Sequence, residues 1–185
     1  LPFNQQYNYL YMLMARKNLD QPLNEPKNRL IKFNEQISSK YRAGLSLNYL
    51  DDYLGENIVL SSIQEFIQEN QYISSNSRQF ETILQKNTPK NIDWFFRTMV
   101  ETRDLVDYKF GKVSKTKDSI SVKIINKTNT NAPISLYQLK NNEVVNKIWL
   151  NNISTDSTIV IPRLESDKLV LNYNNEVPEY NLRNN

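Results

Sequence analysis

The residue types that most often carry out catalysis are scarce in this sequence. It contains no histidine and no cysteine, which excludes a histidine general base, a thiol nucleophile and a zinc site built on imidazole or thiolate ligands. The one adjacent carboxylate pair that invites attention, Asp51 and Asp52, falls within a predicted helix. Neighbouring helical residues point about 100° apart, so these two carboxylates are expected on a solvated face rather than at a shared proton or metal.

Two further kinds of binding site are not indicated. The three glycines are scattered along the chain, so no phosphate-binding loop is predicted. A carboxylate-only site for a hard cation stays open in principle, but the sequence has no D-x-D-x-D-G loop to form one. The chain therefore offers no complete catalytic or metal-binding motif.

Composition limits the class of partner. The chain has 185 residues, with 23 Lys and Arg against 20 Asp and Glu, a net charge of +3 and a pI near 8.9. This excess of positive charge is too small and too dispersed to indicate a nucleic-acid partner. The densest basic run, residues 109–118, flanks a predicted hairpin turn, where lysines usually protect a sheet edge from pairing. No apolar run has membrane-spanning length. We expect neither nucleic acid as a partner nor a membrane span in this segment.

The periodicity of the apolar residues changes near residue 104, which predicts an α+β chain in two parts: a helical subdomain over 1–104 and a small antiparallel, immunoglobulin-like β-sandwich over 105–185. Helices are predicted over about 5–17, 39–54, 57–70, after the 74–77 cap signal, and near 93–99. Strands are predicted over about 106–113, 119–126, 133–139, 143–150, 157–161 and 168–173.

Apolar stripes predict how the helices are buried. One helix carries Tyr41, Leu45, Tyr49 and Tyr53 at steps of four, and the next places Leu60, Ile63, Phe66 and Ile67 together. The run Trp94-Phe95-Phe96 lies next to the change of period. We interpret it as an apolar plug that holds the two parts together. The sandwich half carries no recognisable site.

Residues 40–84, followed by "NIDWFFRTMV" (91–100), resemble the region downstream of the zinc site in the gluzincin aminopeptidases, the membrane alanyl aminopeptidase and leukotriene-hydrolase type. The segments 106–113 and 171–185 are similar to the β-sandwich of long bacteroidete members of that family. The resemblance spans most of the chain through the order and spacing of its motifs. It implies that the helical part is the C-terminal portion of a gluzincin catalytic domain and that a structural β-sandwich follows.

The resemblance also implies what this segment lacks. The family holds zinc with His-Glu-x-x-His and a distant Glu, and without histidine none of that motif is present. Both ends of the chain lie in mid-pattern, so we expect a fragment whose parent is a zinc metallo-aminopeptidase. The expected partners are the missing N-terminal part of the polypeptide and, in the parent, a peptide substrate. We expect no cofactor in this chain, zinc in the parent, and a bacterial periplasmic or cell-envelope location for the parent.

Tyr41 is the one site residue that the resemblance carries over. "Tyr41-Arg42-Ala43-Gly44" resembles the family's Tyr-x-Lys-Gly, with Ala43 in place of the lysine. In the family this tyrosine stabilises the tetrahedral oxyanion. The resemblance therefore predicts that the Tyr41 hydroxyl lies on an open face near the start of its helix. The alternative is that Tyr41 belongs to the core stripe, as helical aromatic stripes usually do.

Two functions from different classes therefore stay open. The first is a non-catalytic C-terminal fragment of a zinc-dependent aminopeptidase-like metallopeptidase, inactive on its own. The alternative is a stand-alone protein- or glycan-binding module of a bacterial surface protein. A His-Glu-x-x-His motif encoded upstream of Leu1 would distinguish the first from the second.

Overall fold

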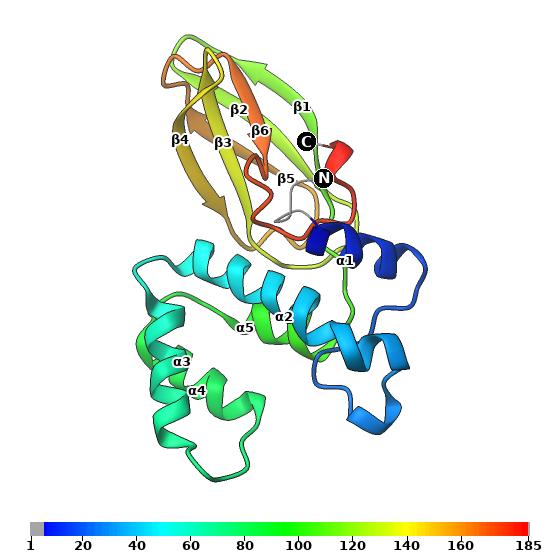
Figure 1. The fold of residues 1–185 in the computed structure, drawn as a ribbon. Coiled ribbons are helices and arrows are strands. Elements are labelled where there is room, and N and C mark those ends of the chain that lie inside the picture. Colours follow the sequence, from blue (N-terminus) through cyan, green and yellow to red (C-terminus); the bar gives the residue numbers. More distant parts are fainter. Residues whose placement is uncertain (1–5, 185) are drawn as a thin grey trace. The chain divides into compact units, whose positions relative to one another are not determined.

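The structure is a computed structural model that describes residues 6–184, without the side chains of residues 38, 39 and 184. The chain divides into two compact units, Leu1–Arg103 and Asp104–Asn185, named here the helical unit and the β unit. The predicted boundary lay between residues 104 and 105. The predicted α+β fold, with helices followed by small antiparallel sheets, is confirmed (Figure 1).

The helical unit is built from one long helix, Lys32–Leu54, and several shorter ones. The stripe residues Tyr41, Tyr49 and Tyr53 are buried, since amphipathic helices gain most of their stability from tertiary packing. The predicted packing of Leu60 and Ile67 is wrong, because these two side chains are 53% and 55% exposed. In chain order the elements are α1 (Gln6–Arg16), η2 (Lys27–Arg29), α2 (Lys32–Leu54), α3 (Ile58–Glu69), α4 (Ser77–Asn87), α5 (Asp93–Phe95) and η3 (Phe96–Glu101), of which η2 is a 3₁₀-helix and η3 a π-helix.

Local sequence signals explain several helix ends. The Asn76 side chain accepts hydrogen bonds from the N–H groups of Arg78 and Gln79, and Gln79 Oε1 accepts one from the Asn76 N–H. Together these bonds form a complete capping box at the start of α4. Gly55 ends α2 at φ 70°, a left-handed conformation that glycine adopts without a Cβ penalty. At its other end α2 begins at Lys32, well before the predicted start at residue 39.

Aromatic rings fill the centre of the helical unit. Trp94 lies between Tyr49 and Tyr53 of α2, with ring centroids 4.6 and 5.5 Å away, and all three side chains are buried. Phe96 packs edge-to-face on Phe95, with centroids 5.2 Å apart. These ring contacts belong to the helical unit. The predicted role of Trp94-Phe95-Phe96 as a plug between the two units stays a prediction.

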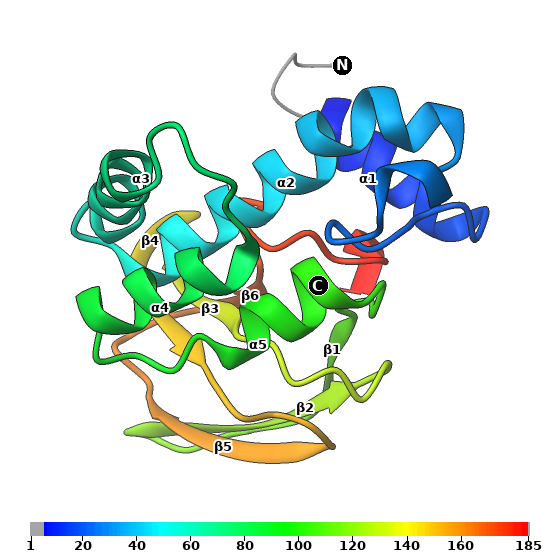
Figure 2. The same ribbon diagram turned by 90° about the horizontal axis from the view of Figure 1, so that it is seen from below.

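The β unit contains two three-stranded antiparallel sheets, in the orders β1-β2-β5 and β4-β3-β6. Figure 2 shows them as two layers. Burial alternates strictly along β2, where Ile120, Val122 and Ile124 are buried, as expected of a strand with one face on a core. The strands are β1 (Tyr108–Lys115), β2 (Ser119–Asn126), β3 (Ile134–Lys140), β4 (Glu143–Leu150), β5 (Ser157–Pro162) and β6 (Lys168–Leu171), with η4 (Leu182–Asn184) near the end.

A buried tyrosine joins three segments of the β unit. The Tyr108 hydroxyl lies 2.9, 2.8 and 3.1 Å from the carbonyl oxygens of Thr130, Ala132 and Ile153. Asn126 Nδ2 donates to two of the same carbonyls, at 3.0 Å to Thr130 and 2.6 Å to Ile153. These bonds satisfy loop carbonyls that would otherwise be buried without a partner. They fix the segments before β3 and after β4 to the start of β1.

Candidate functional site

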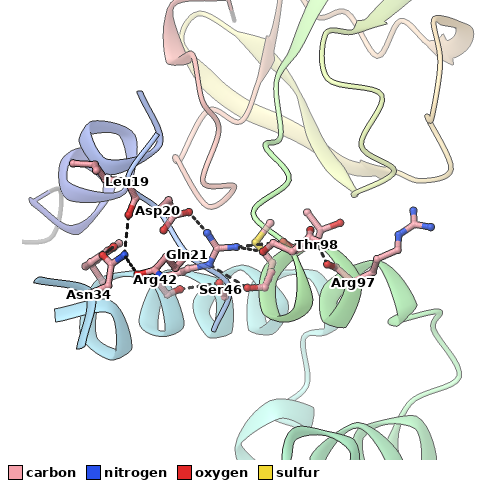
Figure 3. Close-up of polar contacts among 11 residues, drawn as sticks. Leu19, Asp20, Gln21, Asn34, Arg42, Ser46, Arg97 and Thr98 are labelled. Atoms are coloured by element: carbon pink, nitrogen blue, oxygen red, sulfur yellow. Dashed lines mark hydrogen bonds and ion pairs between the residues drawn. The ribbon is translucent and has the colours of Figure 1, made fainter. Parts of the chain in front are cut away.

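The predicted site residue, Tyr41, lies in a buried polar cluster of the helical unit. Tyr41 is fully buried on the core-facing side of α2, and its hydroxyl donates a hydrogen bond to Asn34 Oδ1 at 3.0 Å. Asn34 Nδ2 in turn donates to the Leu19 carbonyl at 2.8 Å and to Gln21 Oε1 at 3.0 Å (Figure 3). Asn34, which the Tyr41 hydroxyl holds, therefore connects α2 to the loop that follows α1.

The predicted position of Tyr41 is wrong in both of its parts. Because α2 begins at Lys32, Tyr41 lies in the middle of the helix rather than near its start. Its hydroxyl is bonded inside the unit instead of lying on an open face. This position agrees with the alternative interpretation, in which Tyr41 belongs to the core stripe. The oxyanion role in a longer enzyme is not tested by this position and stays a prediction.

The centre of the cluster is the next residue, Arg42, whose side chain is only 1% exposed. Its guanidinium forms an ion pair with Asp20, which lies in the loop after α1 and is 3% exposed. A buried charge is tolerated only where it is paired and hydrogen-bonded. Asp20 supplies the counter-charge.

Arg42 also completes the end of the π-helix η3. It donates from Nε to the Met99 carbonyl at 3.2 Å, and from Nη2 to the carbonyls of Thr98 and Thr102 at 3.4 and 2.6 Å. The last carbonyls of a helix have no partner within the helix, and the fixed fork of a guanidinium can serve several acceptors at once. Arg42 thus joins three separate segments: the loop after α1, helix α2 and the end of η3.

The electrostatics of the cluster are those of a desolvated interior. Burial raises the pKa of the Asp20 carboxyl above its usual 3.8, against the opposing effect of the Arg42 charge. Asp20 Oδ1 has no hydrogen-bond partner among the residues described, which fits this desolvation. Burial also raises the pKa of the neighbouring Tyr11 to about 12, again against the Arg42 charge. Tyr11 therefore stays protonated at neutral pH.

Sequence reasoning missed the Arg42–Asp20 pair, although one signal was present. Arg42, Ser46, Tyr49 and Tyr53 follow at steps of four, three and four, so the arginine shares the helix face of two buried tyrosines. A charge on such a face must find a partner. Nothing in the sequence, however, identifies Asp20 as that partner.

Asp51 and Asp52 are both exposed on α2, as expected of a solvated face.

A second polar cluster, in the β unit, was not predicted. The Glu176 carboxylate, 3% exposed, accepts a hydrogen bond from the Tyr137 hydroxyl and pairs with Lys147 Nζ at 2.9 Å. Lys147 Nζ also lies 4.9 Å from the centroid of the Trp149 ring, within cation–π range. Burial alone would raise the Glu176 pKa, but the bonds from Tyr137 and Lys147 outweigh it and the pKa is lowered. This cluster attaches the segment after β6 to strands β3 and β4.

Neither cluster has the composition of a metal centre. In residues 6–184 no group of three or more His, Cys, Asp or Glu side chains is arranged to hold a metal ion. No helix within the same range combines the length and apolar character that crossing a membrane requires.

Comparison with known proteins gives a likeness of fold. No protein-family model and no curated protein matches this sequence. Among solved structures, the chain is similar to Legionella pneumophila aminopeptidase A in complex with aspartic acid, with a TM-score of 0.61 and 10% sequence identity. The match covers 75% of this chain and 17% of the aminopeptidase chain. Three quarters of the chain is more than either unit contains, so the likeness includes residues of both.

Proposed function

We propose that this chain is the non-catalytic C-terminal part of a zinc-dependent aminopeptidase-like metallopeptidase. In this proposal the helical unit forms the back of the catalytic domain and the β unit is a structural sandwich. The observation that carries the proposal is the likeness in fold to a small part of an aminopeptidase chain, covering three quarters of this chain. An active centre would have to come from the remainder of the polypeptide.

The chemistry of the described residues supports a structural role. The chain lacks histidine. The two polar clusters described above are occupied by internal bonds among Tyr41, Asn34, Arg42 and Asp20 and among Tyr137, Lys147 and Glu176. Zinc in an aminopeptidase activates water and polarises the scissile carbonyl. In our proposal both tasks belong to residues upstream of Leu1.

The proposal also determines what would be needed for the oxyanion role of Tyr41. In the described structure the hydroxyl donates its one proton to Asn34. To donate to an oxyanion it would have to give up this bond. A Tyr41→Phe substitution in the longer protein tests the role, since losing one transition-state donor lowers turnover by roughly two to three orders of magnitude with little change in substrate affinity.

The first experiment is to read the coding sequence upstream of Leu1. We expect a His-Glu-x-x-His motif in the same reading frame, and a stoichiometric zinc ion in the purified longer protein. A signal peptide joined directly to this segment would instead favour a stand-alone binding module of a bacterial surface protein.

A further inference from the structure

The segment after β6 leads from one sheet of the β unit to the other. Strand β6 belongs to the sheet β4-β3-β6, whereas the chain that follows it reaches the residues just before β1 of the sheet β1-β2-β5. There Glu179 forms a parallel β-bridge with Val106, and the Tyr180 N–H donates to the Val106 carbonyl at 2.8 Å. Residues 172–180, which lie between β6 and η4 in Figure 1, are named the strap.

Glu176 attaches the strap to β3 and β4. Its carboxylate pairs with Lys147 Nζ of β4 at 2.9 Å and accepts a hydrogen bond from the Tyr137 hydroxyl of β3. Asn174, also in the strap, donates from Nδ2 to the same hydroxyl at 3.1 Å. Hydrogen bonds to a charged group are stronger than those between neutral groups. The strap can leave β3 and β4 only if these bonds break.

A second buried carboxylate attaches the strap near the start of β1. Glu179 is only 1% exposed. Its Oε1 accepts a hydrogen bond from the Tyr108 N–H at 3.1 Å, and its Oε2 accepts one from Asn172 Nδ2 at 3.0 Å. Together with the bonds to Val106, this attachment holds the chain at the beginning of the β unit.

Asn172 links the two attachments to each other. Besides its bond to Glu179, its Nδ2 donates to the Val177 carbonyl at 2.7 Å, and its Oδ1 accepts from the Val177 N–H at 2.9 Å. Its φ is 49°, a left-handed conformation that asparagine tolerates better than most residues. One buried side chain therefore holds Glu179 and also the residue next to Glu176.

We propose that the strap opens and closes as one unit, and that its closure fixes the first residues of the β unit. Folded domains open locally in cooperative segments at a lower free energy than global unfolding requires. The division between the two units falls after Arg103, so Val106 is the third residue of the β unit. When the strap opens, Val106 loses its bridge to Glu179 and its bond to Tyr180. The strap thus determines how firmly the chain is held directly after the helical unit ends.

Amide hydrogen exchange in the present chain tests the proposal at the attachment that the substitution does not touch. Glu176→Gln removes the charge that pairs with Lys147. We expect the amides of Tyr108 and Tyr180 to exchange about tenfold faster or more, while those of β2 change little. Rates at Tyr108 and Tyr180 that equal the wild-type rates, or that rise no more than those of β2, would overturn the proposal.

The matched control is Asp156→Asn in the same unit. Asp156 pairs with Lys123 at 2.9 Å, but the two side chains are 42% and 43% exposed, and exposed ion pairs contribute little to stability. This control should leave the exchange rates at Tyr108 and Tyr180 unchanged. Faster exchange there in the control would show that any lost charge pair loosens the β unit, and would refute a specific role of the strap.

A second variant keeps the test decisive if Glu176→Gln fails to fold. Lys147→Gln weakens the same attachment from β4 and changes no residue of the strap. It should also speed exchange at Tyr108 and Tyr180, whereas Lys123→Gln should not. Unchanged rates in Lys147→Gln would mean that the two attachments are independent, which contradicts the proposal. Both measurements use the present chain alone, so their outcome does not depend on the proposed function.

Discussion

Replacement of Arg42 is the most informative single change in the helical unit. Arg42→Met keeps the length and much of the volume of the side chain but removes the guanidinium. The change leaves the Asp20 carboxylate buried without its counter-ion. It also removes the donor to the carbonyls of Met99, Thr98 and Thr102 at the end of η3.

The expected loss of stability follows from that geometry. Removing one partner of a buried ion pair costs about 3–5 kcal/mol, and both Arg42 and Asp20 are almost fully buried. The loss is a large share of the roughly 5–15 kcal/mol that stabilises an ordinary domain. It should be smaller under mildly acidic conditions, because without Arg42 the Asp20 carboxyl can take up a proton instead of remaining charged. Adding Asp20→Leu to Arg42→Met should recover part of the loss, since the uncompensated charge is then gone.

Urea unfolding measured by tryptophan fluorescence gives the free energy. In a Trp149→Phe background the signal comes from Trp94 alone, which lies in the helical unit. Arg97→Met is the matched control, because Arg97 is an exposed arginine of η3 whose side chain points away from the cluster (Figure 3). The control should change the free energy of unfolding by less than about 0.5 kcal/mol. If Arg42→Met cost no more than this control, the description of Arg42 as a buried connection between three segments would be refuted.

Three further predictions concern the same unit. Burial raises the Asp20 pKa above its unfolded value of 3.8, so Asp20 contributes stability at low pH that is lost as the pH rises through the folded-state pKa. The free energy of unfolding of the wild type relative to Asp20→Asn should therefore fall over that interval. A difference that stays constant in urea titrations would contradict this. Tyr41→Phe should lower the free energy of unfolding by about 1–3 kcal/mol, because Asn34 Oδ1 loses its donor in a buried place; an unchanged urea midpoint would show that the bond is not formed. Asn76→Ala should cost about 0.5–2 kcal/mol through loss of the capping box, whereas Ser75→Ala, one residue earlier, should leave thermal unfolding unchanged.

The strands were predicted more accurately than the helices, for a physical reason. The strands over 119–126 and 143–150 have the predicted bounds, because turn-forming residues on both sides of each run constrain where the strand begins and ends. The start of α2 was misplaced because Ile31, its N-cap residue, provides no side-chain cap. Without a capping residue the sequence gives little indication of where the helix begins.

The candidate site could be predicted only in part. Tyr41 was singled out, but its surroundings depend on Asn34, Leu19 and Gln21, which the folding of a loop brings to α2. The ion pair of Arg42 with Asp20 spans 22 positions of sequence. The π-helix whose end Arg42 completes leaves no distinct periodicity over six residues. Such long-range polar contacts follow from tertiary packing rather than from local pattern.

Hydrolysis of aminoacyl-anilide substrates by two purified proteins tests the central proposal most directly. One is the present chain, and the other is the polypeptide encoded by the whole reading frame. We predict that the longer polypeptide cleaves the substrate and carries stoichiometric zinc, while the present chain does neither. Turnover or tightly bound zinc in the present chain, or a longer polypeptide that neither binds zinc nor cleaves any aminoacyl-anilide, would contradict the account.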